Sequence, residues 1–363
     1  MTRATRSRPG PVSHVLLLAV IAAMLLATAP LGAAHAQQAQ RVTRLTADSN
    51  TGAAIAWSRL TYAAGAGPTV LLARDDVFVD TLTTGSAQGA LDAPLLLTDG
   101  DALSPDTATE LERLGAQDVT IMGGEHAVSA AVEAELADLG YATTRLSGAT
   151  RLETATEVAG AFFPNATTAV IARAFPTSDE QTQAFADSLA VGSFSAGTGI
   201  PVLLTEVDRL SDSTRAYLDA ASVENIIVVG GTAAVSEAVM AELATIDMES
   251  KGPGAELTVN RVAAGTRFGT AVALANEFGY STAADAPRIL LIAGTGADAW
   301  ASGLPAGAQS GSGAATVLAD GATLPAETLA LLEGGSGKPL ICGPAVEASA
   351  CDAAAEALGL TGS

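Results

Sequence analysis

The sequence predicts an α/β protein made of three tandem repeats, each with a parallel sheet covered by helices. One observation is a 21-residue window that occurs three times, as FADSLAVGSFSAGTGIPVLLT (185–205), FVDTLTTGSAQGALDAPLLLT (78–98) and WASGLPAGAQSGSGAATVLAD (300–320). A second is that short, continuous apolar runs alternate with helical segments, which favours parallel strands buried on both faces. Because internal repeats decide an architecture, we divide the chain into repeats at 37–142, 143–256 and 257–363.

Each repeat follows the same order of predicted elements. A short strand ends in an Arg-containing turn, and a helix and an apolar strand follow. The window then supplies a helix and a strand, and a third apolar strand precedes the last helix. The second repeat, which also has a clear extra helix at 211–221, places these elements at 143–146, 153–163, 169–172, 185–205, 225–231 and 236–244. The first repeat places them at 41–45, 51–62, 70–73, 78–98, 119–124 and 129–139, and the third at 257–262, 270–278, 289–293, 300–320, 340–344 and 347–358.

The first 36 residues are typical of a secretory signal peptide. Three arginines precede an apolar run at Val15–Ala29, and Ala34-His35-Ala36 offers a small-x-small cleavage site. The apolar run is shorter than the roughly 20 residues of a spanning helix. An uncleaved anchor is the alternative; otherwise we expect a secreted chain with no membrane span after cleavage.

The composition excludes one class of partner. Without residues 1–36, which carry three arginines and no acids, the net charge changes from −21 to −24. Nucleic-acid binders need a basic footprint, so we expect no nucleic-acid partner.

Two cysteines, Cys342 and Cys351, stand nine positions apart at the end of a predicted strand and in the following helix. In an exported chain this spacing favours a disulfide, with two free thiols as the alternative. Two thiolates without supporting histidines make a poor zinc site, so we expect no metal centre and no cofactor.

An ordered set of motifs carries a family resemblance. In the second repeat, Arg-x-x-Gly-x-x-Arg-x-x-Thr-Ala (145–155) precedes the FADSLAVG window, and PVLLT and Gly-Gly-x-x-Ala-Val-Ser (230–236) follow it. Together they resemble the cell wall-binding repeat type 2 family of Gram-positive surface proteins, across essentially the whole chain after the signal.

The resemblance implies three Rossmann-like units packed as a pseudo-threefold assembly. It also implies a secreted, non-catalytic protein of the cell wall or cell surface, attached non-covalently to an anionic, teichoic-acid-like wall polymer. Two departures stand out. The first repeat lacks the second Arg of the start motif, and in the third repeat Trp300-Ala301-Ser302 replaces Phe-Ala-Asp.

Four arginines of the start motifs, where turns enter helices, are candidate ligand-binding residues. A guanidinium near a helix N-terminus can hold a phosphate or carboxylate, aided by free backbone N–H groups. The alternative is an inter-repeat salt bridge to one of the 39 acids. Divalent cations such as Ca²⁺, bridging acids and polymer phosphates, are another physical route. These arginines are Arg145, Arg151, Arg261 and Arg267.

Two acids and two threonines of the window are further candidates. Asp80 and Asp187 are predicted at the start of the window helix, where a carboxylate either interacts with the helix N-terminus or contacts a ligand. Thr98 and Thr205 end their strands at the carboxyl edge of the sheet, where ligands of open α/β sheets bind. The resemblance implies that the Pro-Leu-Leu segment lies at the polymer-binding face in some members, which adds Pro94 and Pro201; the leucines themselves are expected in the core.

The remaining polar features carry weaker signals. The pairs Gly123-Gly124 and Gly230-Gly231 either cradle a phosphate or form tight turns that need positive φ. His126, the one histidine left after signal removal, lacks partners for a metal site, and we expect it at the surface. Two other hypotheses stay open: a wall-associated amidase or its modulator, and an acidic extracellular scaffold for cations or small molecules.

Overall fold

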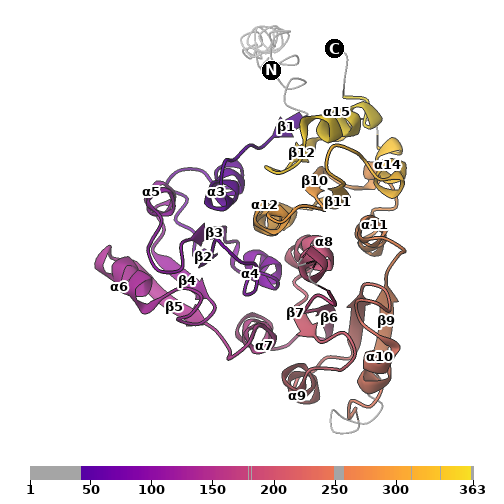
Figure 1. The fold of residues 1–363 in the computed structure, drawn as a ribbon, viewed down its shortest axis with the longest axis horizontal. Helices are drawn as coiled ribbons and strands as arrows, with labels where there is room; N and C mark the ends of the chain where they lie inside the picture. Colours follow the sequence, from indigo (N-terminus) through magenta and orange to yellow (C-terminus); the bar gives the residue numbers. More distant parts are fainter. Residues whose placement is uncertain are drawn as a thin grey trace, which may run out of the picture. The chain divides into compact units, whose positions relative to one another are not determined.

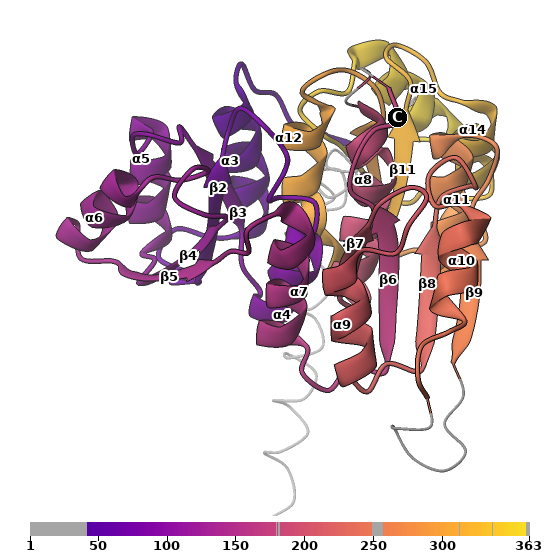
Figure 2. The same ribbon diagram turned by 60° about the horizontal axis from the view of Figure 1, so that its bottom comes forward.

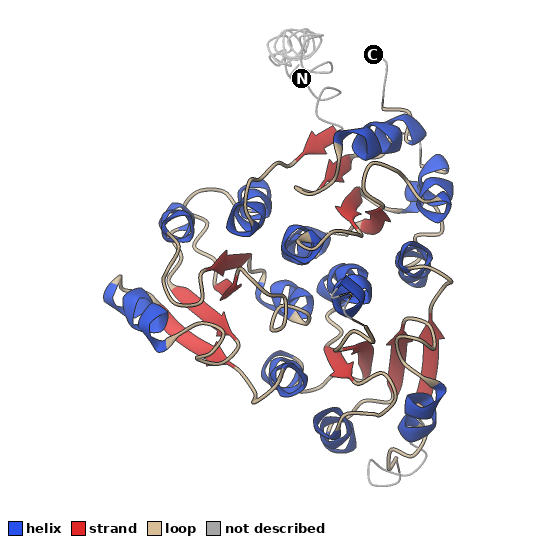
Figure 3. Cartoon of the chain, viewed as in Figure 1, coloured by secondary structure: helices blue, strands red, loops and turns tan. Residues whose placement is uncertain are grey.

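The computed structural model describes residues 42–360, except 179, 181, 249–256, 312 and 336. The predicted signal peptide therefore lies outside the described residues. The described part contains three four-stranded sheets, and every pairing between their strands is parallel. Helices alternate with the strands and surround the sheets (Figures 1 and 3). The predicted α/β fold of three repeats is confirmed.

The three sheets have the same strand order. Sheet 1 runs β3 (Leu95–Thr98), β2 (Val70–Arg74), β4 (Asp118–Met122), β5 (Ala142–Leu146). Sheet 2 runs β7 (Val202–Thr205), β6 (Thr168–Arg173), β8 (Asn225–Val229), β9 (Thr258–Val262). Sheet 3 runs β11 (Ala315–Ala319), β10 (Ile289–Ala293), β12 (Leu340–Cys342), β1 (Val42–Arg44).

Sheets 1 and 2 each take their last strand from the following repeat, and sheet 3 takes its last strand from the first repeat. The opening strands of repeats two and three, β5 and β9, pair with β4 of sheet 1 and β8 of sheet 2. The opening strand of repeat one, β1, pairs with β12 of sheet 3, and its Arg44 forms an ion pair with Asp352. The three sheets are thus linked in a closed cycle.

The helices occupy two layers. In one layer, a helix follows each of the exchanged strands β1, β5 and β9: α3 (Asn50–Thr61), α7 (Arg151–Phe162) and α11 (Arg267–Glu277). The window helices of the same layer follow β2, β6 and β10: α4 (Thr84–Leu91), α8 (Thr182–Thr198), and α12 (Ala299–Gly303) with α13 (Gly307–Ser310). Two 3₁₀ turns, η2 (Ala283–Asp285) and η3 (Leu304–Ala306), lie in the third repeat. The others cover the outer faces: α5 (Pro105–Leu114), α6 (Ala130–Asp138), α9 (Asp212–Ala220), α10 (Glu237–Leu243), α14 (Ala326–Glu333) and α15 (Ala348–Ala357). Figures 1 and 2 show α4, α8 and α12 in the middle, between the three sheets.

Two-sided burial explains the unbroken apolar strands. In β2, Val70 and Leu72 belong to the outer core of repeat one, whereas Leu71 and Ala73 belong to the central core. The same alternation divides β10 between an outer cluster (Ile289, Leu291) and the central one (Leu290, Ile292). A parallel strand covered on both faces needs apolar residues at every position.

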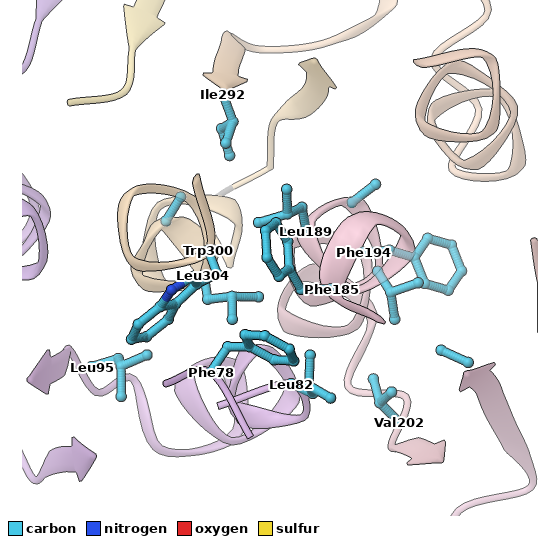
Figure 4. Close-up of a cluster of buried hydrophobic side chains, with 14 of the residues drawn as sticks. Phe78, Leu82, Leu95, Phe185, Leu189, Phe194, Val202, Ile292, Trp300 and Leu304 are labelled. Atoms are coloured by element: carbon cyan, nitrogen blue, oxygen red, sulfur yellow. The ribbon is translucent and has the colours of Figure 1, made fainter. Parts of the chain in front are cut away.

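The aromatic residues that open the three windows meet in this central core. The ring centroids of Phe78 and Phe185 lie 5.1 Å apart, and those of Phe78 and Trp300 lie 6.4 Å apart, both in edge-to-face geometry (Figure 4). Trp57 of α3 donates its indole N–H to the carbonyl of Ser302 at 2.7 Å. The repeated window is therefore the part of each repeat that joins it to the other two.

The predicted disulfide is present. Cys342 at the end of β12 and Cys351 in α15 are bonded, and both residues are buried. The bond closes the connection between the strand and the following helix, in the sheet that β1 completes.

Candidate functional site

Charged side chains gather at the carboxyl edges of sheets 1 and 2, where each meets the first helix of the next repeat. We call these two groups the Arg–Asp clusters. Cluster 1 contains Arg74, Asp80, Arg151 and Thr154. Cluster 2 contains Arg173, Asp187 and Arg267. Because each cluster combines residues of two consecutive repeats, an isolated repeat cannot form one.

The acid of each cluster lies against a glycine at the end of a strand. A Cβ added to Gly123 would come within 2.6 Å of the Asp80 carboxylate, and one added to Gly230 within 2.8 Å of the Asp187 carboxylate. Both glycines have φ +96°, a conformation that L side chains rarely adopt. The prediction that the glycine pairs form tight turns is confirmed, and these turns leave room for the two acids.

The sequence placed Asp80 and Asp187 at the start of the window helix, and this placement is wrong. Asp80 lies in the turn before α4, which begins at Thr84, and Asp187 lies inside α8, which begins at Thr182. Small residues hid both boundaries, since helical periodicity is weak in segments of Gly, Ala, Ser and Thr. Neither acid therefore sits in the first turn of its helix.

In cluster 1 a partly buried acid lies near two arginines. The Thr154 hydroxyl donates to Asp80 Oδ1 at 3.3 Å. Burial raises the pKa of Asp80, and the Thr154 hydrogen bond and the charges of Arg151 and Arg74 oppose this rise. Arg74 forms an ion pair with Asp76 and donates to the carbonyl of His126 at 3.1 Å.

Arg151, the first residue of α7, keeps unused hydrogen-bonding capacity. Its Nη1 donates to the carbonyl of Ala174 at 2.7 Å, and its guanidinium lies 4.7 Å from the ring centroid of Phe175 and 5.7 Å from that of Phe78. In the described part of the chain no acid lies within salt-bridge distance of it. Burial lowers the pKa of Arg151, with the Asp80 charge opposing, but a guanidinium stays protonated at neutral pH.

Cluster 2 has the same plan and is more deeply buried. Arg173 Nε and Asp187 Oδ2 are 4.0 Å apart, which is too long for a hydrogen bond. Nε is buried and has no partner among the described residues. Burial raises the pKa of Asp187 and lowers that of Arg173, and their mutual attraction opposes both shifts. Arg267, the first residue of α11, donates to the carbonyl of Gly294 at 2.9 Å and contacts Glu180 at 3.4 Å.

The carboxyl edge of sheet 3, where it meets the first helix of repeat one, lacks the arginines and the acid of the Arg–Asp clusters. The last residue of β10 is Ala293, where β2 and β6 end in Arg74 and Arg173. Ser302 occupies the window position of the two acids. The first residue of α3 is Asn50, where α7 and α11 begin with arginine, and its amide donates to the carbonyl of Asp75 at 2.8 Å. No cluster residue is conserved at this third junction.

The other two predicted arginines do not reach the clusters. Arg145 lies on β5 and Arg261 on β9, not in the turns expected from the sequence. Arg145 donates to the carbonyls of Gly123 and Val128 and forms an ion pair with Glu133 at 2.6 Å. Arg261 makes the corresponding bonds to Gly230 and Val235 and pairs with Glu237 at 3.0 Å. Both are inter-repeat salt bridges, the alternative that the sequence left open.

The predicted threonines end their strands at the carboxyl edge, in register with Arg74 and Arg173, but they are buried, and the predicted prolines lie at the opposite edge. Thr98 and Thr205 are fully buried, and their hydroxyls donate to the carbonyls of Ala102 and Arg209 in the loops that follow the strands. Pro94 and Pro201 are buried at the amino ends of β3 and β7, the edge opposite the clusters. The adjoining leucines are in the core, as expected. His126 is exposed, also as expected.

Sequence reasoning missed Arg74 and Arg173. Both end the motif of their strand, in VLLAR and AVIAR, whereas the third repeat reads ILLIA over the same five positions and ends in Ala293. Aligning the three repeats one residue beyond the apolar run identifies them. Asn50 was hidden because the start of the first repeat does not match the Arg-containing motif.

Comparisons with known proteins agree with this architecture. Cwp8 from Clostridium difficile superposes with a TM-score of 0.73 at 24% identity, covering 89% of this chain and 52% of that one. Cwp6 from the same organism also gives 0.73, at 19% identity, covering 87% and 48%. These two similarities concern the fold.

Two curated relatives come from Bacillus subtilis. N-acetylmuramoyl-L-alanine amidase LytC is 28% identical over 239 residues, which is 66% of this chain and 46% of that protein. Amidase enhancer is 28% identical over 195 residues, 53% of this chain and 25% of that protein. The chain thus spans less than half the length of these relatives.

The family match covers more than half of the chain. The Cell wall binding domain 2 (CWB2) family matches residues 32–133 and 145–240, which contain cluster 1 and the Arg173 and Asp187 positions of cluster 2. The third repeat, where the cluster residues are replaced, lies beyond these matches. The chain belongs to the Cell wall binding domain 2 family.

Proposed function

We propose that this protein is a secreted, non-catalytic wall-binding module that holds an anionic cell-wall polymer at its two Arg–Asp clusters. The observation that carries the proposal is the repetition of two arginines around one acid at two inter-repeat junctions. In each cluster one guanidinium retains donors that the described protein groups do not use: Arg151 in cluster 1 and Nε of Arg173 in cluster 2. Guanidiniums of this kind suit phosphate or carboxylate oxygens.

The strongly acidic chain can bind an anion at these places because electrostatic interactions are local. At physiological ionic strength the screening length is about 8 Å, so distant surface acids contribute little at a partly buried site. Arg151 and Arg267 also begin helices, where free N–H groups favour an anion. A teichoic-acid-like polyphosphate, with anionic groups at regular intervals, fits two quasi-equivalent sites.

Wall retention with matched variants tests the proposal. The mature chain is incubated with purified walls, intact or stripped of anionic polymer, and the bound fraction is measured. We expect retention on intact walls only, and its loss in the double variant Arg151→Gln/Arg267→Gln. Arg209→Gln is the control, because among the described residues this exposed arginine forms its ion pairs with nearby Glu206 and Asp212 on the surface. Equal retention on stripped walls would contradict the polymer-binding part.

The non-catalytic part of the proposal has its own test. A zinc amidase needs several ligands around an activated water. No group of three His, Cys, Asp or Glu able to hold a metal ion occurs in the part of the chain that the structure describes. We expect no muropeptide release by the purified protein. Release would instead favour an amidase, as in the similarity to LytC, and stimulation of an added amidase would favour a modulator.

A requirement for calcium is the other physical route to polymer binding. If Asp80 and Asp187 bridge polymer phosphates through Ca²⁺, a chelator will abolish retention. Direct binding by the arginines predicts that retention survives the chelator. Wall pull-down with and without chelator therefore separates the two modes.

A further inference from the structure

A polar cavity of about 530 Å³ opens where all three repeats meet. Its lining comes from the ends of α3 and α4, from α8, from α13 and from the residue before β10. Helices that follow parallel strands run back along the sheet, so their carboxyl ends lie at the amino edge of the strands. The cavity is therefore at the opposite edge from the Arg–Asp clusters, and its size is in the range of small-molecule sites. We call it the axial pocket.

Two glutamines form part of a fixed wall. Gln88 donates to the carbonyl of Leu304 at 2.9 Å and accepts from the N–H of Ala308 at 3.1 Å. Gln309 accepts from Arg288 Nη1 at 2.8 Å and donates to the Thr61 hydroxyl at 2.9 Å. These bonds join repeats one and three and hold the side chains in place. A wall of fixed polar groups is typical of a preorganised binding site.

Asp92 is conformationally costly where it stands. It follows α4 in the left-handed region with φ 49°, and no other non-glycine residue among those described has a positive φ. Gly199 (φ 68°) stands three residues before β7, as Asp92 stands three residues before β3, and Gly313 (φ 85°) stands two residues before β11. Glycine adopts this conformation without strain. Retention of a strained residue on a cavity wall points to a use for its side chain.

The Asp92 carboxylate has room for a ligand. It is exposed and accepts one hydrogen bond among the described residues, from the Tyr62 hydroxyl at 3.3 Å. Burial and the nearby carboxylate raise the pKa of Tyr62, so the phenol stays protonated and donates. A carboxylate offers about four acceptor positions, so most remain available.

Arg288 supplies the complementary donor. Its guanidinium donates one hydrogen bond to Gln309. It is not within salt-bridge distance of any acid that the structure describes. The carboxyl ends of α3 and α4 add partial negative charge around the pocket. An anionic ligand is therefore disfavoured here, whereas a ligand rich in hydroxyl donors suits Asp92 and the helix ends.

We propose that the axial pocket binds a neutral sugar unit, whose hydroxyls donate to Asp92 and accept from Arg288. A sugar fits because its hydroxyls both donate and accept, matching the carboxylate, amide, hydroxyl and guanidinium groups of one small cavity. The unit belongs either to a wall glycan or to a free saccharide. This site is separate from the Arg–Asp clusters and does not depend on polymer binding there.

Saturation-transfer NMR on the full mature chain tests the proposal. The probes are glucose, galactose, N-acetylglucosamine and N-acetylmannosamine, each at millimolar concentration, with titration of any sugar that receives saturation. We expect transfer to at least one sugar and a dissociation constant at least about tenfold higher in Asp92→Gly and in Arg288→Gln. Asp92→Gly is informative because glycine (Gly199) is the residue at this position in the second repeat and adopts positive φ without strain, so the unfolding temperature of the variant should be unchanged or higher.

Two controls complete the experiment. Arg151→Gln, which removes a cluster 1 guanidinium, and Asp219→Asn, an exposed acid on α9, should leave sugar binding unchanged. Absence of transfer to every sugar, or equal affinity in Asp92→Gly and the wild type, overturns the proposal. Transfer to glycine or D-alanine but to no sugar also overturns it, in favour of a zwitterion. A wall glycan as the source predicts competition by glycan fragments, and a free saccharide predicts none. Because wall retention is measured separately, its failure would not imply failure here.

Discussion

Gly85 of α4 and Gly192 of α8 contact each other backbone to backbone across the centre of the three repeats. A Cβ added to Gly85 would come within 2.3 Å of the Gly192 Cα and 2.5 Å of its carbonyl oxygen. The substitution Gly85→Ala must therefore move α4 away from α8, the helix that carries Phe185 of the Phe78–Phe185 contact. We expect a loss of about 1–3 kcal/mol in the free energy of unfolding, measured by urea denaturation.

Gly160 provides the matched control for this prediction. It lies in α7, and no atom stands within 4 Å of a Cβ built there. Alanine is a better helix former than glycine, so Gly160→Ala should be neutral or stabilising by up to about 1 kcal/mol. Similar losses in both variants would show that the close approach of α4 and α8 is not the cause.

Glu110 on α5 is a fully buried acid that anchors α3 to α5. It accepts hydrogen bonds from Ser58 at 2.7 Å, Arg59 at 3.0 Å and Arg113 at 2.6 Å. Burial alone would raise the pKa of Glu110, but the three hydrogen bonds outweigh it and the pKa is lowered. We expect Glu110→Gln to lower the free energy of unfolding at pH 7 by about 1.5–3 kcal/mol.

The pH dependence of this effect follows from the direction of the shift. A folded-state pKa below the unfolded value of about 4.3 contributes stability above that pH and loses it as the pH falls through the folded pKa. The difference between wild type and Glu110→Gln should therefore shrink between pH 7 and pH 3. Glu112→Gln, an exposed position on the same helix, should change little at either pH. A difference that stays constant with pH would exclude a role for the Glu110 charge.

The disulfide between Cys342 and Cys351 should stabilise sheet 3, the sheet that β1 completes, and the helix α15 that follows β12. Cys342 and Cys351 are nine positions apart, and a loop of this length restricts the unfolded chain by about 2–3 kcal/mol in the loop-entropy description. We expect Cys342→Ala/Cys351→Ala to lose stability of this order and to exchange amide hydrogens faster in β12 and α15. The wild type with reductant should behave like the double variant. Insensitivity of the wild type to reductant would argue against a stabilising bond.

The sequence predicted the three repeats and their α/β class because each repeat carries the same periodic signal three times. It did not reveal that β5, β9 and β1 leave their own repeat, since a strand of three to five residues shows no partner preference in sequence alone. The Arg145 and Arg261 contacts are a consequence of this exchange. Each arginine lies on an exchanged strand and bonds the glycine turn of the preceding repeat.

The candidate site was only partly predictable for a similar reason. Arg151, Arg267, Asp80 and Asp187 were recognised as chemically suitable, but which of them meet depends on packing between repeats. Burial removed Thr98, Thr205 and the two prolines from consideration, and burial of a polar residue cannot be judged from its own sequence position. The equivalence of Asn50 to the two helix-initial arginines appears only when the helices are compared in space.

Polymer binding should strengthen at mildly acidic pH. Burial raises the pKa values of Asp80 and Asp187, so these carboxyls become neutral at a higher pH than ordinary ones. As the pH falls towards these raised pKa values, each cluster gains net positive charge, and its affinity for a polyphosphate should rise. Because burial disfavours the charged form of both acids, their protonation removes the free-energy cost of burying two carboxylates. Protonation of these acids therefore does not by itself destabilise the fold. Asp80→Asn/Asp187→Asn should bind well at pH 7 and show a flatter pH profile. Weaker retention at pH 5 would instead favour cation bridging by the acids.

Two of the three junctions should bind polymer, and the third should not. Soluble polymer fragments too short to span two clusters allow the sites to be counted by calorimetry. We expect two binding events per wild-type chain, and one after either Arg151→Gln or Arg267→Gln, because each arginine belongs to a single cluster. Asn50→Ala, at the same helix position of the third junction, should leave both events in place, since Ala293 and Ser302 supply neither guanidinium nor carboxylate there. A third event that disappears in Asn50→Ala would show that binding depends on the backbone at the helix start and not on the Arg–Asp pair.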